Sequence, residues 1–256
     1  MAGHTPAPRR LAGKSVSRLA LLALLALLAL CSAVCCGRAP SGTSAKPRET
    51  SATAATGAWQ SLGLSGGGAM YTPAISPADP KLMLLNCDMS AAYRSSDGGA
   101  NWHMLHYRQL LGSTRVSPVF HPTDPKTVFA VNGWGGELKV SRDKGVTWAL
   151  VPGLPRGVSV IGIDPGNPTL MLVGTYQGLY RSPDGGKQWK AVPALPGQAI
   201  GFHFDRTSPA DKRVCFAATE ASVYRSNDGG LTWTDVGGGL PSNQVVTFAG
   251  GSNAQT

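Results

Sequence analysis

The chain has 256 residues and a formal net charge of +9, from 23 Lys and Arg against 14 Asp and Glu. Residues 1–57 hold seven of the basic residues and one acidic residue, so residues 58–256, with 16 basic and 13 acidic residues, carry a net charge of only +3. That remainder contains no basic stripe with interleaved aromatic residues, and we therefore expect no nucleic-acid partner.

The first 37 residues have the pattern of an export signal. A basic stretch ending at Arg18 precedes an unbroken Leu and Ala run of 12 residues, Leu19 to Leu30, and small residues follow. This run is too short to span a bilayer comfortably and is typical of the apolar core of a secretory signal. We expect residues 1–37 to be a targeting segment and the protein to be exported, either extracellular or periplasmic. The adjacent Arg9 and Arg10 raise a twin-arginine signal as an alternative, but the flanking residues match it poorly.

Two ways of processing this signal stay open. The stretch Leu28-Ala29-Leu30-Cys31 resembles a bacterial lipoprotein box, with a bulky Leu where Gly or Ala is usual. Lipidation of Cys31 would anchor the protein to the cell envelope, whereas simple cleavage would leave no membrane contact. Residues 38–57 consist mostly of Ala, Ser, Thr, Pro and Gly, which predicts a disordered linker, and residues 58–256 form the folded part.

The most informative feature is an octapeptide of the form Ser-x-Asp-x-Gly-x-x-Trp that occurs four times. The copies contain Ser95, Asp97, Gly99 and Trp102; Ser141, Asp143, Gly145 and Trp148; Ser182, Asp184, Gly186 and Trp189; and Ser226, Asp228, Gly230 and Trp233. Their aspartates are 46, 41 and 44 residues apart. A repeat of this length is typical of β-propeller blades, each made of four antiparallel strands. We predict an all-β propeller with about four complete blades.

Turn signals divide each repeat into four strands, A to D. The predicted strands are 69–75, 82–86, 91–95 and 101–105; 116–120, 127–131, 137–141 and 146–150; 159–163, 170–174, 179–182 and 188–192; and 200–204, 214–218, 223–226 and 232–236. Residues 58–62 match a strand D with none before it, and residues 245–249 match a strand A with none after it. We therefore expect the chain to be part of a larger propeller, or else to close its open edges with a partner copy.

The octapeptides, known as Asp boxes, are predicted to be structural. An Asp side chain bonds nearby backbone N–H groups, glycines accept positive φ angles, and the Trp packs between sheets. A catalytic group is rarely needed four times, so the repetition itself favours a structural role.

The opposite face of the propeller holds the candidate ligand contacts. Because the octapeptides are C–D turns, the B–C turns lie at the other end with the D-to-A crossovers. Counting seven residues back from each octapeptide Ser places Asp88, Trp134, Thr175 and Thr219 there, followed by Met89, Gly135, Tyr176 and Glu220. Carboxylates beside aromatic rings suit a carbohydrate cleft. The predicted contacts are Trp134, Tyr176, Glu220 and, from the first crossover, Tyr107 and Arg108.

Asp88 and Trp134 also have simpler, structural explanations. Asp88 has the position of a residue that caps the B–C hairpin, and Trp134, between glycines, is expected to be exposed whether or not it binds a ligand. The chain has no phosphate-binding glycine loop, no His-Glu-x-x-His and no Gly-x-Ser-x-Gly elbow. We expect no cofactor and no metal. Cys87 and Cys215 are expected to be buried thiols, with a disulfide as the alternative.

One stretch resembles a known family. Trp59-Gln60-Ser61, Gly66-Gly67-Gly68-Ala69-Met70, Ile75-Ser76-Pro77-Ala78-Asp79-Pro80 and Cys87-Asp88-Met89-Ser90-Ala91-Ala92-Tyr93-Arg94 are similar to the opening of glycoside hydrolase family 74, which hydrolyses xyloglucan. The resemblance implies two seven-bladed Asp-box propellers with a substrate cleft between them, and implies that Asp88 is the catalytic base. It is specific over residues 59–94 and becomes generic beyond.

Departures from that family limit what the resemblance implies. Ser90-Ala91 replaces the usual pair of glycines beside Asp88, and the second catalytic Asp of the family lies in a second propeller that this sequence does not include. An inverting glycosidase needs both an acid and a base, so this chain alone is expected to be inactive.

Two hypotheses follow. The first is an exported glycosidase acting on polysaccharide with Asp88 as its base. The second is a non-catalytic propeller at the cell envelope that binds glycan or protein. Asp boxes also occur in sialidases, sortilin-like receptors and photosystem assembly factors, but the Arg-Ile-Pro signature of sialidases is absent.

Overall fold

The computed structural model describes residues 68–89, 91–133, 136–193, 195–240 and 244–252. All of them belong to the second of the two units into which the chain divides, Trp59–Thr256. The residues expected to form the export signal, the linker and the stray strand 58–62 lie outside the described ranges. Within those ranges no helix is long and apolar enough to cross a membrane.

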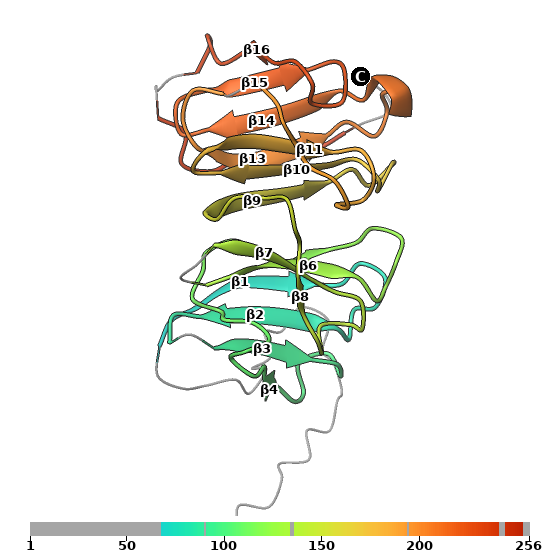
Figure 1. Ribbon diagram of the computed structural model, residues 1–256, viewed down its shortest axis with the longest axis vertical. Coiled ribbons are helices and arrows are strands. Elements are labelled where there is room, and N and C mark those ends of the chain that lie inside the picture. The colour runs from blue at the N-terminus through green and yellow to red at the C-terminus, as the bar shows by residue number, and fades with distance from the viewer. Residues whose placement is uncertain (1–67, 90, 134–135, 194, 241–243, 253–256) are drawn as a thin grey trace, which may run out of the picture. The chain divides into compact units, whose positions relative to one another are not determined.

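The described residues form sixteen β-strands and one short 3-10 helix, Ala210–Lys212 (Figure 1). The strands are β1 Met70–Ile75, β2 Met83–Cys87, β3 Ala92–Ser95, β4 His103–Met104, β5 Val119–Phe120, β6 Val128–Asn132, β7 Glu137–Ser141, β8 Ala149–Leu150, β9 Val158–Ile163, β10 Met171–Thr175, β11 Gly178–Ser182, β12 Lys190–Ala191, β13 Ala199–Phe204, β14 Cys215–Thr219, β15 Val223–Ser226 and β16 Thr234–Asp235.

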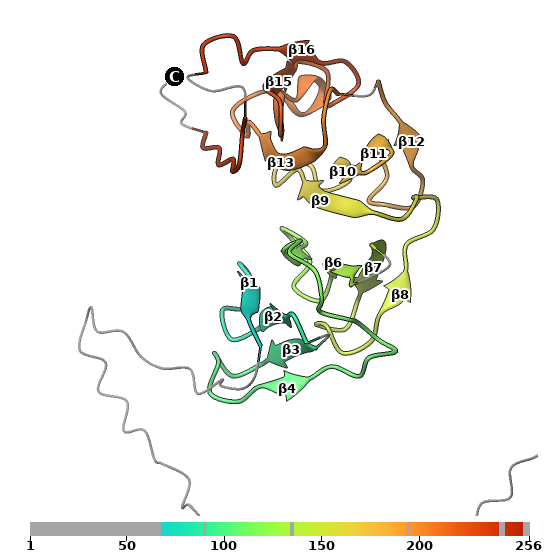
Figure 2. The same cartoon turned by 90° about the vertical axis from the view of Figure 1, so that its left-hand side faces the viewer.

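Each sheet is built from four consecutive antiparallel strands. The orders are β1-β2-β3-β4, β5-β6-β7-β8, β9-β10-β11-β12 and β13-β14-β15-β16. The first strands of neighbouring sheets contact one another, β1 with β5, β5 with β9 and β9 with β13. The last strands β4, β8, β12 and β16 lie on the opposite, outer side (Figure 2). These meanders are four propeller blades, which confirms the predicted fold class.

The last strand of each blade is shorter than predicted, with two ladder residues where five were expected. The octapeptide carboxylate explains the difference. Asp143 Oδ1 accepts the backbone N–H of Thr147 at 2.9 Å, as Asp228 does from Thr232. Because the amide of Thr147 is already bonded to a side chain, pairing with β7 begins only at Ala149.

A second prediction was wrong: residues 245–249 are not a strand. They nevertheless lie against the fourth blade, since Val245 N donates to the carbonyl of Glu220, the residue after β14, at 2.9 Å. A Cβ built on Gly201 of β13 would lie 2.8 Å from the ring of Phe248, much as one on Gly162 of β9 would lie 2.9 Å from Phe204. The segment therefore packs on β13 as the first strand of a following blade would. Among the described residues no strand pairs with it, so no ladder forms.

Each octapeptide is a stapled hairpin turn. In the second copy the hydroxyl of Ser141 donates to Asp143 Oδ1 at 2.7 Å and accepts from Gly145 N at 2.8 Å. The indole of Trp148 donates to the carbonyl of Gly145 at 3.1 Å, and the third and fourth copies repeat this bond. The first copy differs, because Trp102 Nε1 is buried without a partner among the described residues.

Three apolar clusters fill the spaces between successive blades. Trp148 packs with Leu84 of the first blade and Val128 of its own blade. Trp189 packs on the cluster between the second and third blades, and Trp233 on the cluster between the third and fourth. The octapeptide Trp therefore joins each blade to the one before it, as predicted from the repeat.

Polar contacts supplement this packing. Arg213 and Asp164, both almost fully buried, form an ion pair of 2.7 Å between the fourth and third blades. The guanidinium also donates to the backbone carbonyls of Asp205 and Ser208, so its charge is well satisfied. Arg94 and Arg181 each donate to a carbonyl in the octapeptide turn of the next blade.

Cys87 and Cys215 are free, buried thiols, which confirms the preferred interpretation of the two cysteines. Burial raises the pKa of the Cys215 thiol to about 12. This thiol is therefore protonated at neutral pH and unreactive.

We expect acid to weaken the octapeptide staples. Hydrogen bonds from Asn101 lower the pKa of Asp97 to about 2. Burial alone would raise the pKa of Asp143, but hydrogen bonds from Thr147 and Ser141 outweigh it and lower that pKa to about 2. The pKa of Asp in an unfolded chain is about 3.9. The stabilisation is therefore complete above about pH 4 and is lost as the pH falls through the lower pKa of the folded state.

Thermal melts of the protein and of Asp143→Asn test this. The difference in melting temperature should be largest near neutral pH and shrink as the pH approaches about 2. Asp211→Asn, which changes an exposed carboxylate of the 3-10 turn, should melt like the parent protein throughout. A difference for Asp143→Asn that does not change with pH would contradict the assignment.

Candidate functional site

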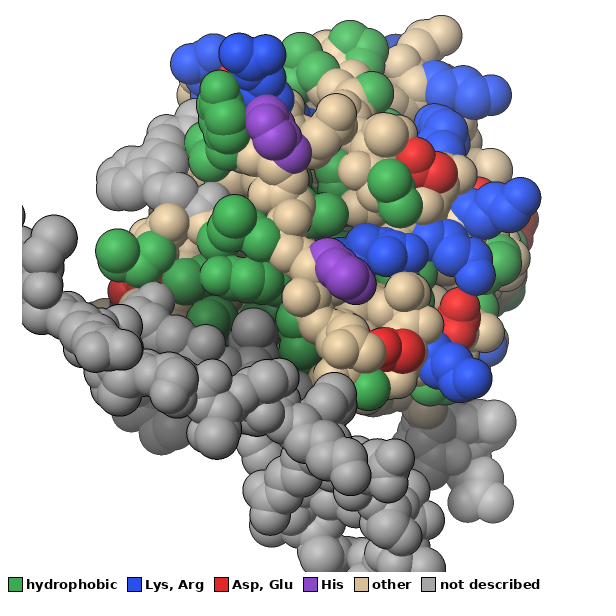
Figure 3. Space-filling model, turned by 90° about the horizontal axis from the view of Figure 1, so that it is seen from below, with side chains coloured by type: hydrophobic (Ala, Val, Ile, Leu, Met, Phe, Trp, Pro, Cys, Tyr) green, Lys and Arg blue, Asp and Glu red, His purple; other side chains and the backbone are tan. Residues whose placement is uncertain are grey.

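The B–C turns lie at the opposite end of the blades from the octapeptide turns. Asp88 and Met89 follow β2, Tyr176 and Gln177 separate β10 from β11, and Glu220 follows β14. Trp134 and Gly135 lie outside the described residues. On the face drawn in Figure 3, several basic side chains lie side by side, with acidic side chains interspersed among them.

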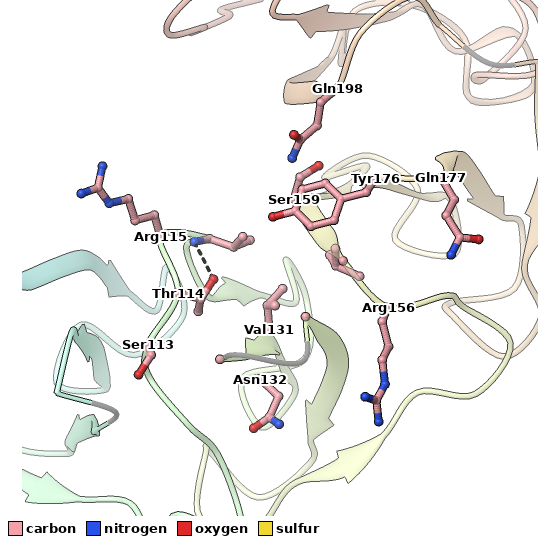
Figure 4. A pocket seen from close by; sticks show the side chains of 15 residues that line it. Ser113, Thr114, Arg115, Val131, Asn132, Arg156, Ser159, Tyr176, Gln177 and Gln198 are labelled. Carbon is pink, nitrogen blue, oxygen red and sulfur yellow. Dashed lines mark hydrogen bonds between the residues drawn. The ribbon is translucent and has the colours of Figure 1, made fainter.

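A cleft of about 660 Å³ crosses this end of the second and third blades (Figure 4). We call it the B–C cleft. Its lining consists of Ser113, Thr114, Arg115, Val116, Val131, Asn132, Gly133, Gly136, Arg156, Gly157, Val158, Ser159, Tyr176, Gln177 and Gln198. The lining comes from a crossover, from the ends of β6 and β9 and from the β10–β11 turn, so no single blade makes it.

Two smaller hollows adjoin the cleft. One of about 260 Å³ is lined by Tyr71, Asp88 and the crossover residues 113–115. The other, of about 400 Å³, lies between the third and fourth blades and shares Tyr176, Gln177 and Gln198 with the main cleft. The three hollows share lining residues, and we call them together the groove; Asp88 lines the hollow at the first-blade side.

Asp88 is both a turn residue and a groove residue. Its Oδ1 accepts the backbone N–H of Ala69 at 2.9 Å, and its own N–H donates to the carbonyl of Ala69 at 3.1 Å. These bonds fix the turn after β2 against the start of β1. The other carboxylate oxygen has no hydrogen-bond partner among the described residues, and the side chain is exposed. Asp88 thus ties the turn after β2 to the residue before β1 and also lines a hollow; its predicted role as the cap of the B–C hairpin stays a prediction.

Tyr176 is the aromatic wall of the cleft. Its ring is 75% exposed and lies directly against Gly157, where a Cβ would collide with ring carbons. The backbone N–H of Tyr176 donates to the carbonyl of Gly157 at 3.0 Å, which holds the turn in place. Gly157 has a φ of +86°, a conformation that favours glycine. An exposed ring held on a rigid backbone can stack on a flat apolar surface.

The remaining predicted contacts lie apart from this wall. Glu220 is exposed beside the groove, with its backbone N–H bonded to Gln198 O at 3.2 Å. Tyr107 and Arg108 pair with each other through a hydrogen bond of 3.1 Å and a ring contact. Their crossover packs on the second blade, where Gln109 accepts Trp148 N at 2.8 Å. Neither Tyr107 nor Arg108 lines the three hollows.

Sequence reasoning missed several lining residues. Ser159 and Gln198 lie near Tyr176 (Figure 4), and Arg115 and Arg156 supply charge. Glu137 neutralises Arg156 through an ion pair of 2.7 Å, and Asn132 Nδ2 donates to the same carboxylate at 3.1 Å. A signal was available for Asn132: it occupies a mainly apolar strand position, nine residues before the octapeptide Ser, where the third and fourth blades have Val173 and Ala217.

The charges of the groove restrict its chemistry. Asp88 is the only carboxylate among the described residues that line the three hollows. Within the same part of the chain, no group of three or more His, Cys, Asp or Glu is arranged to hold a metal ion. The described groove thus offers one acid, two tyrosine rings, two arginines and several hydroxyl and amide groups.

The fold defines a class of protein, a β-propeller of four-stranded antiparallel blades. No family model matches the chain. The chain is 29% identical over 148 residues to the xyloglucanase Xgh74A of Acetivibrio thermocellus, covering 45% of this chain and 18% of that protein. It is 26% identical over 145 residues to a probable oligoxyloglucan-reducing end-specific xyloglucanase of Neosartorya fischeri, covering 49% and 18%. The alignments thus span less than a fifth of each relative.

Solved structures agree on the fold. An ancestral GH74 enzyme superposes with a TM-score of 0.55 at 18% identity, over 68% of this chain and 26% of that one. The GH74 xyloglucanase from Xanthomonas campestris superposes with a TM-score of 0.53 at 24% identity, over 71% and 32%. The four blades therefore correspond to part of a larger propeller architecture.

We expect Gly157→Ala to displace the Tyr176 ring. Because Gly157 and Gly185 both have positive φ, alanine at either position should cost about 1 kcal/mol of stability. Only the Cβ at 157 meets a neighbour, since one at 185 has nothing within 4 Å. A crystal structure of Gly157→Ala should show the ring rotated from its position, whereas Gly185→Ala should keep it. An unmoved ring in Gly157→Ala would refute the contact.

Proposed function

We propose that these blades form part of the substrate groove of an exported, glycoside-hydrolase-like propeller that acts on or binds polysaccharide of the xyloglucan type. One observation carries the proposal: Asp88 lines a hollow that shares residues 113–115 with the cleft lined by the exposed Tyr176 ring, in a chain whose curated relatives are xyloglucanases. The groove crosses several blades, which suits an extended polymer rather than a compact metabolite.

Tyr176 is proposed as the sugar platform. The C–H faces of a pyranose ring are apolar and stack on aromatic rings, while the hydroxyls at its edge need hydrogen-bond partners. Gln177 and Gln198 line the same stretch of groove and carry amides that both donate and accept. Trp134, Glu220, Tyr107 and Arg108 remain proposed contacts farther along or beside the groove.

Asp88 is proposed as the general base. The amide of Ala69 fixes one oxygen, and the other is available to take a proton from water as that water attacks the anomeric carbon. In an inverting reaction a second carboxylic acid protonates the departing glycosidic oxygen, at about 6.5–9.5 Å from the base. Since Asp88 is the only carboxylate lining the described groove, the proposal assigns the acid to residues outside the described blades.

The same observation supports a second candidate function. With one described carboxylate in the groove, these blades by themselves can bind a glycan without cleaving it. A glycan- or protein-binding propeller at the cell envelope is therefore the alternative, and in it Asp88 acts only as the cap of the B–C turn.

Export is part of the proposal because xyloglucan-type polysaccharides are extracellular polymers. It rests on the basic and Leu-rich pattern of residues 1–37, with lipidation at Cys31 as the anchored variant. Mass determination of the mature amino terminus in cells distinguishes cleavage from lipidation, and a full-length cytoplasmic product would refute export.

We expect Tyr176→Ala to weaken binding of a xyloglucan oligosaccharide at least about tenfold, the effect of losing about 1.4 kcal/mol of stacking. Leu231→Ala is the control, because Leu231 is also exposed, at 48%, but lies in the fourth octapeptide turn and does not line the groove. Titration calorimetry of both variants measures the dissociation constants. Equal losses in the two variants, or none in Tyr176→Ala, would refute the platform.

We expect the purified protein to release no reducing sugar from xyloglucan, because it lacks the second carboxylate in its described groove. Asp88→Asn should leave oligosaccharide binding within about threefold of the parent, since an amide oxygen can still accept the Ala69 N–H bond. Reducing-sugar release by the parent protein that Asp88→Asn abolishes would show instead that one chain carries a complete site.

A further inference from the structure

Arg115 is an unpaired cation next to Asp88. It lines both the B–C cleft and the hollow that holds Asp88, and its side chain is exposed. The ion pairs among the described residues are Lys144–Asp79, Arg156–Glu137 and Arg213–Asp164. The other cleft arginine, Arg156, is thus neutralised, whereas Arg115 has no acidic partner in the described part of the chain.

The guanidinium of Arg115 is held on an aromatic ring. Its Cζ lies 5.8 Å from the centre of the Tyr71 ring. Figure 4 shows the side chain pointing away from Tyr176, on the other side of the cleft. Within the described part of the chain no hydrogen bond uses the N–H groups of this guanidinium, which are therefore available to donate.

A buried amide fixes the backbone on both sides of Arg115. Asn86 of β2, only 2% exposed, donates from Nδ2 to the carbonyl of Thr114 at 3.2 Å and to that of Val116 at 3.3 Å. The same nitrogen donates to Thr72 Oγ1 at 3.0 Å, so its two hydrogens serve three acceptors. Asn86 therefore ties the crossover that carries Arg115 to the strand that carries Tyr71.

Thr72, whose hydroxyl also accepts a hydrogen bond from Asn86, has a strained backbone. Thr72 has a φ of +51°, a region that β-branched residues rarely occupy. It follows Tyr71 directly and lies where the register of β1 against β2 shifts. Backbone strain of this kind persists only where the surroundings hold it, and it gathers at ligand sites. Tyr71 and Arg115 are thus each adjacent to a residue that Asn86 bonds.

We propose that Arg115, stacked on Tyr71 and positioned by Asn86, binds the carboxylate of an acidic sugar, so that the groove accepts a glycan carrying a uronic acid beside Asp88. The inference rests on the proposed glycan-binding function and names its substrate class. A guanidinium matches a carboxylate with two parallel hydrogen bonds. It also offsets the repulsion that the negative charge of Asp88 exerts on an anion in the same hollow, a task that neutral donors cannot perform.

A pair of matched ligands tests the subsite. One is a neutral xyloglucan oligosaccharide, and the other is the same oligosaccharide after oxidation of primary hydroxyls to carboxylates. The protein should bind the oxidised ligand at least about fivefold more tightly at low ionic strength, and added salt should reduce this preference. Arg115→Gln should abolish the preference for the oxidised ligand.

Arg142→Gln is the matched control, because Arg142 is exposed in the second octapeptide turn, outside the groove. This variant should keep the preference. Equal affinities of the parent protein for the two ligands, or the same preference in Arg115→Gln as in the parent, would overturn the inference.

The outcomes separate this inference from the proposed function. Neutral binding that depends on Tyr176, with no acid preference, would retain the proposed function and refute the subsite. If the protein binds only the oxidised ligand and Arg115→Gln loses that binding, the subsite is retained and the proposed binding of neutral xyloglucan is refuted. Asn86→Ala should lower the acid preference while neutral binding persists, which a merely structural role would not do. If Asn86→Ala fails to fold, the ligand preference of Arg115→Gln decides alone.

Discussion

The geometry of every blade depends on one hydrogen-bonded staple. In each octapeptide an ionised Asp accepts backbone N–H groups of its own turn while a Ser hydroxyl bridges the carboxylate and a glycine amide. The staple fixes where the C–D hairpin turns and where pairing of the last strand starts. It also places the Trp that packs on the preceding blade, so a local bond determines how neighbouring blades meet. The four octapeptides share the bonds among Ser, Asp and Gly, and each is followed by a last strand of two ladder residues.

The groove arises where this regularity ends. Its walls come from crossovers and B–C turns, the parts of the blade that the staple does not constrain, and these differ from blade to blade. Asn86 and Asn132 occupy the same strand position in the first two blades, where the third and fourth have Val173 and Ala217. Both asparagines use that strand position to hold an irregular segment. Asn86 bonds the carbonyls of Thr114 and Val116, and Asn132 accepts the N–H of Leu111 at 3.0 Å. The scaffold thus repeats, and the polar substitutions within it shape the site.

The repeating scaffold could be predicted from the sequence, whereas much of the irregular groove could not. Strands B and C were predicted to within about one residue, because a proline-containing turn precedes each strand B and an octapeptide turn follows each strand C. The D strands were predicted too long, because nothing in an apolar pattern reveals that a carboxylate four residues back takes the N–H of Thr147. Residues 245–249 have the apolar pattern of a strand but no partner to pair with. Asp88 and Tyr176 could be placed in the groove by counting from the repeat. Arg115 could not, because it lies on a crossover and meets Tyr71 only through the bonds of Asn86.

The consecutive strand order of each sheet has a consequence for how the protein folds. Every blade pairs only strands that are neighbours in the chain, so its contacts close short loops and cost little chain entropy. A blade can therefore form as soon as its own residues are available, and each new blade then finds the apolar side of the previous one as a template. Growth of this kind is vectorial, from the amino-terminal blade onward, and it matches the order in which a chain emerges from a ribosome or a translocation pore.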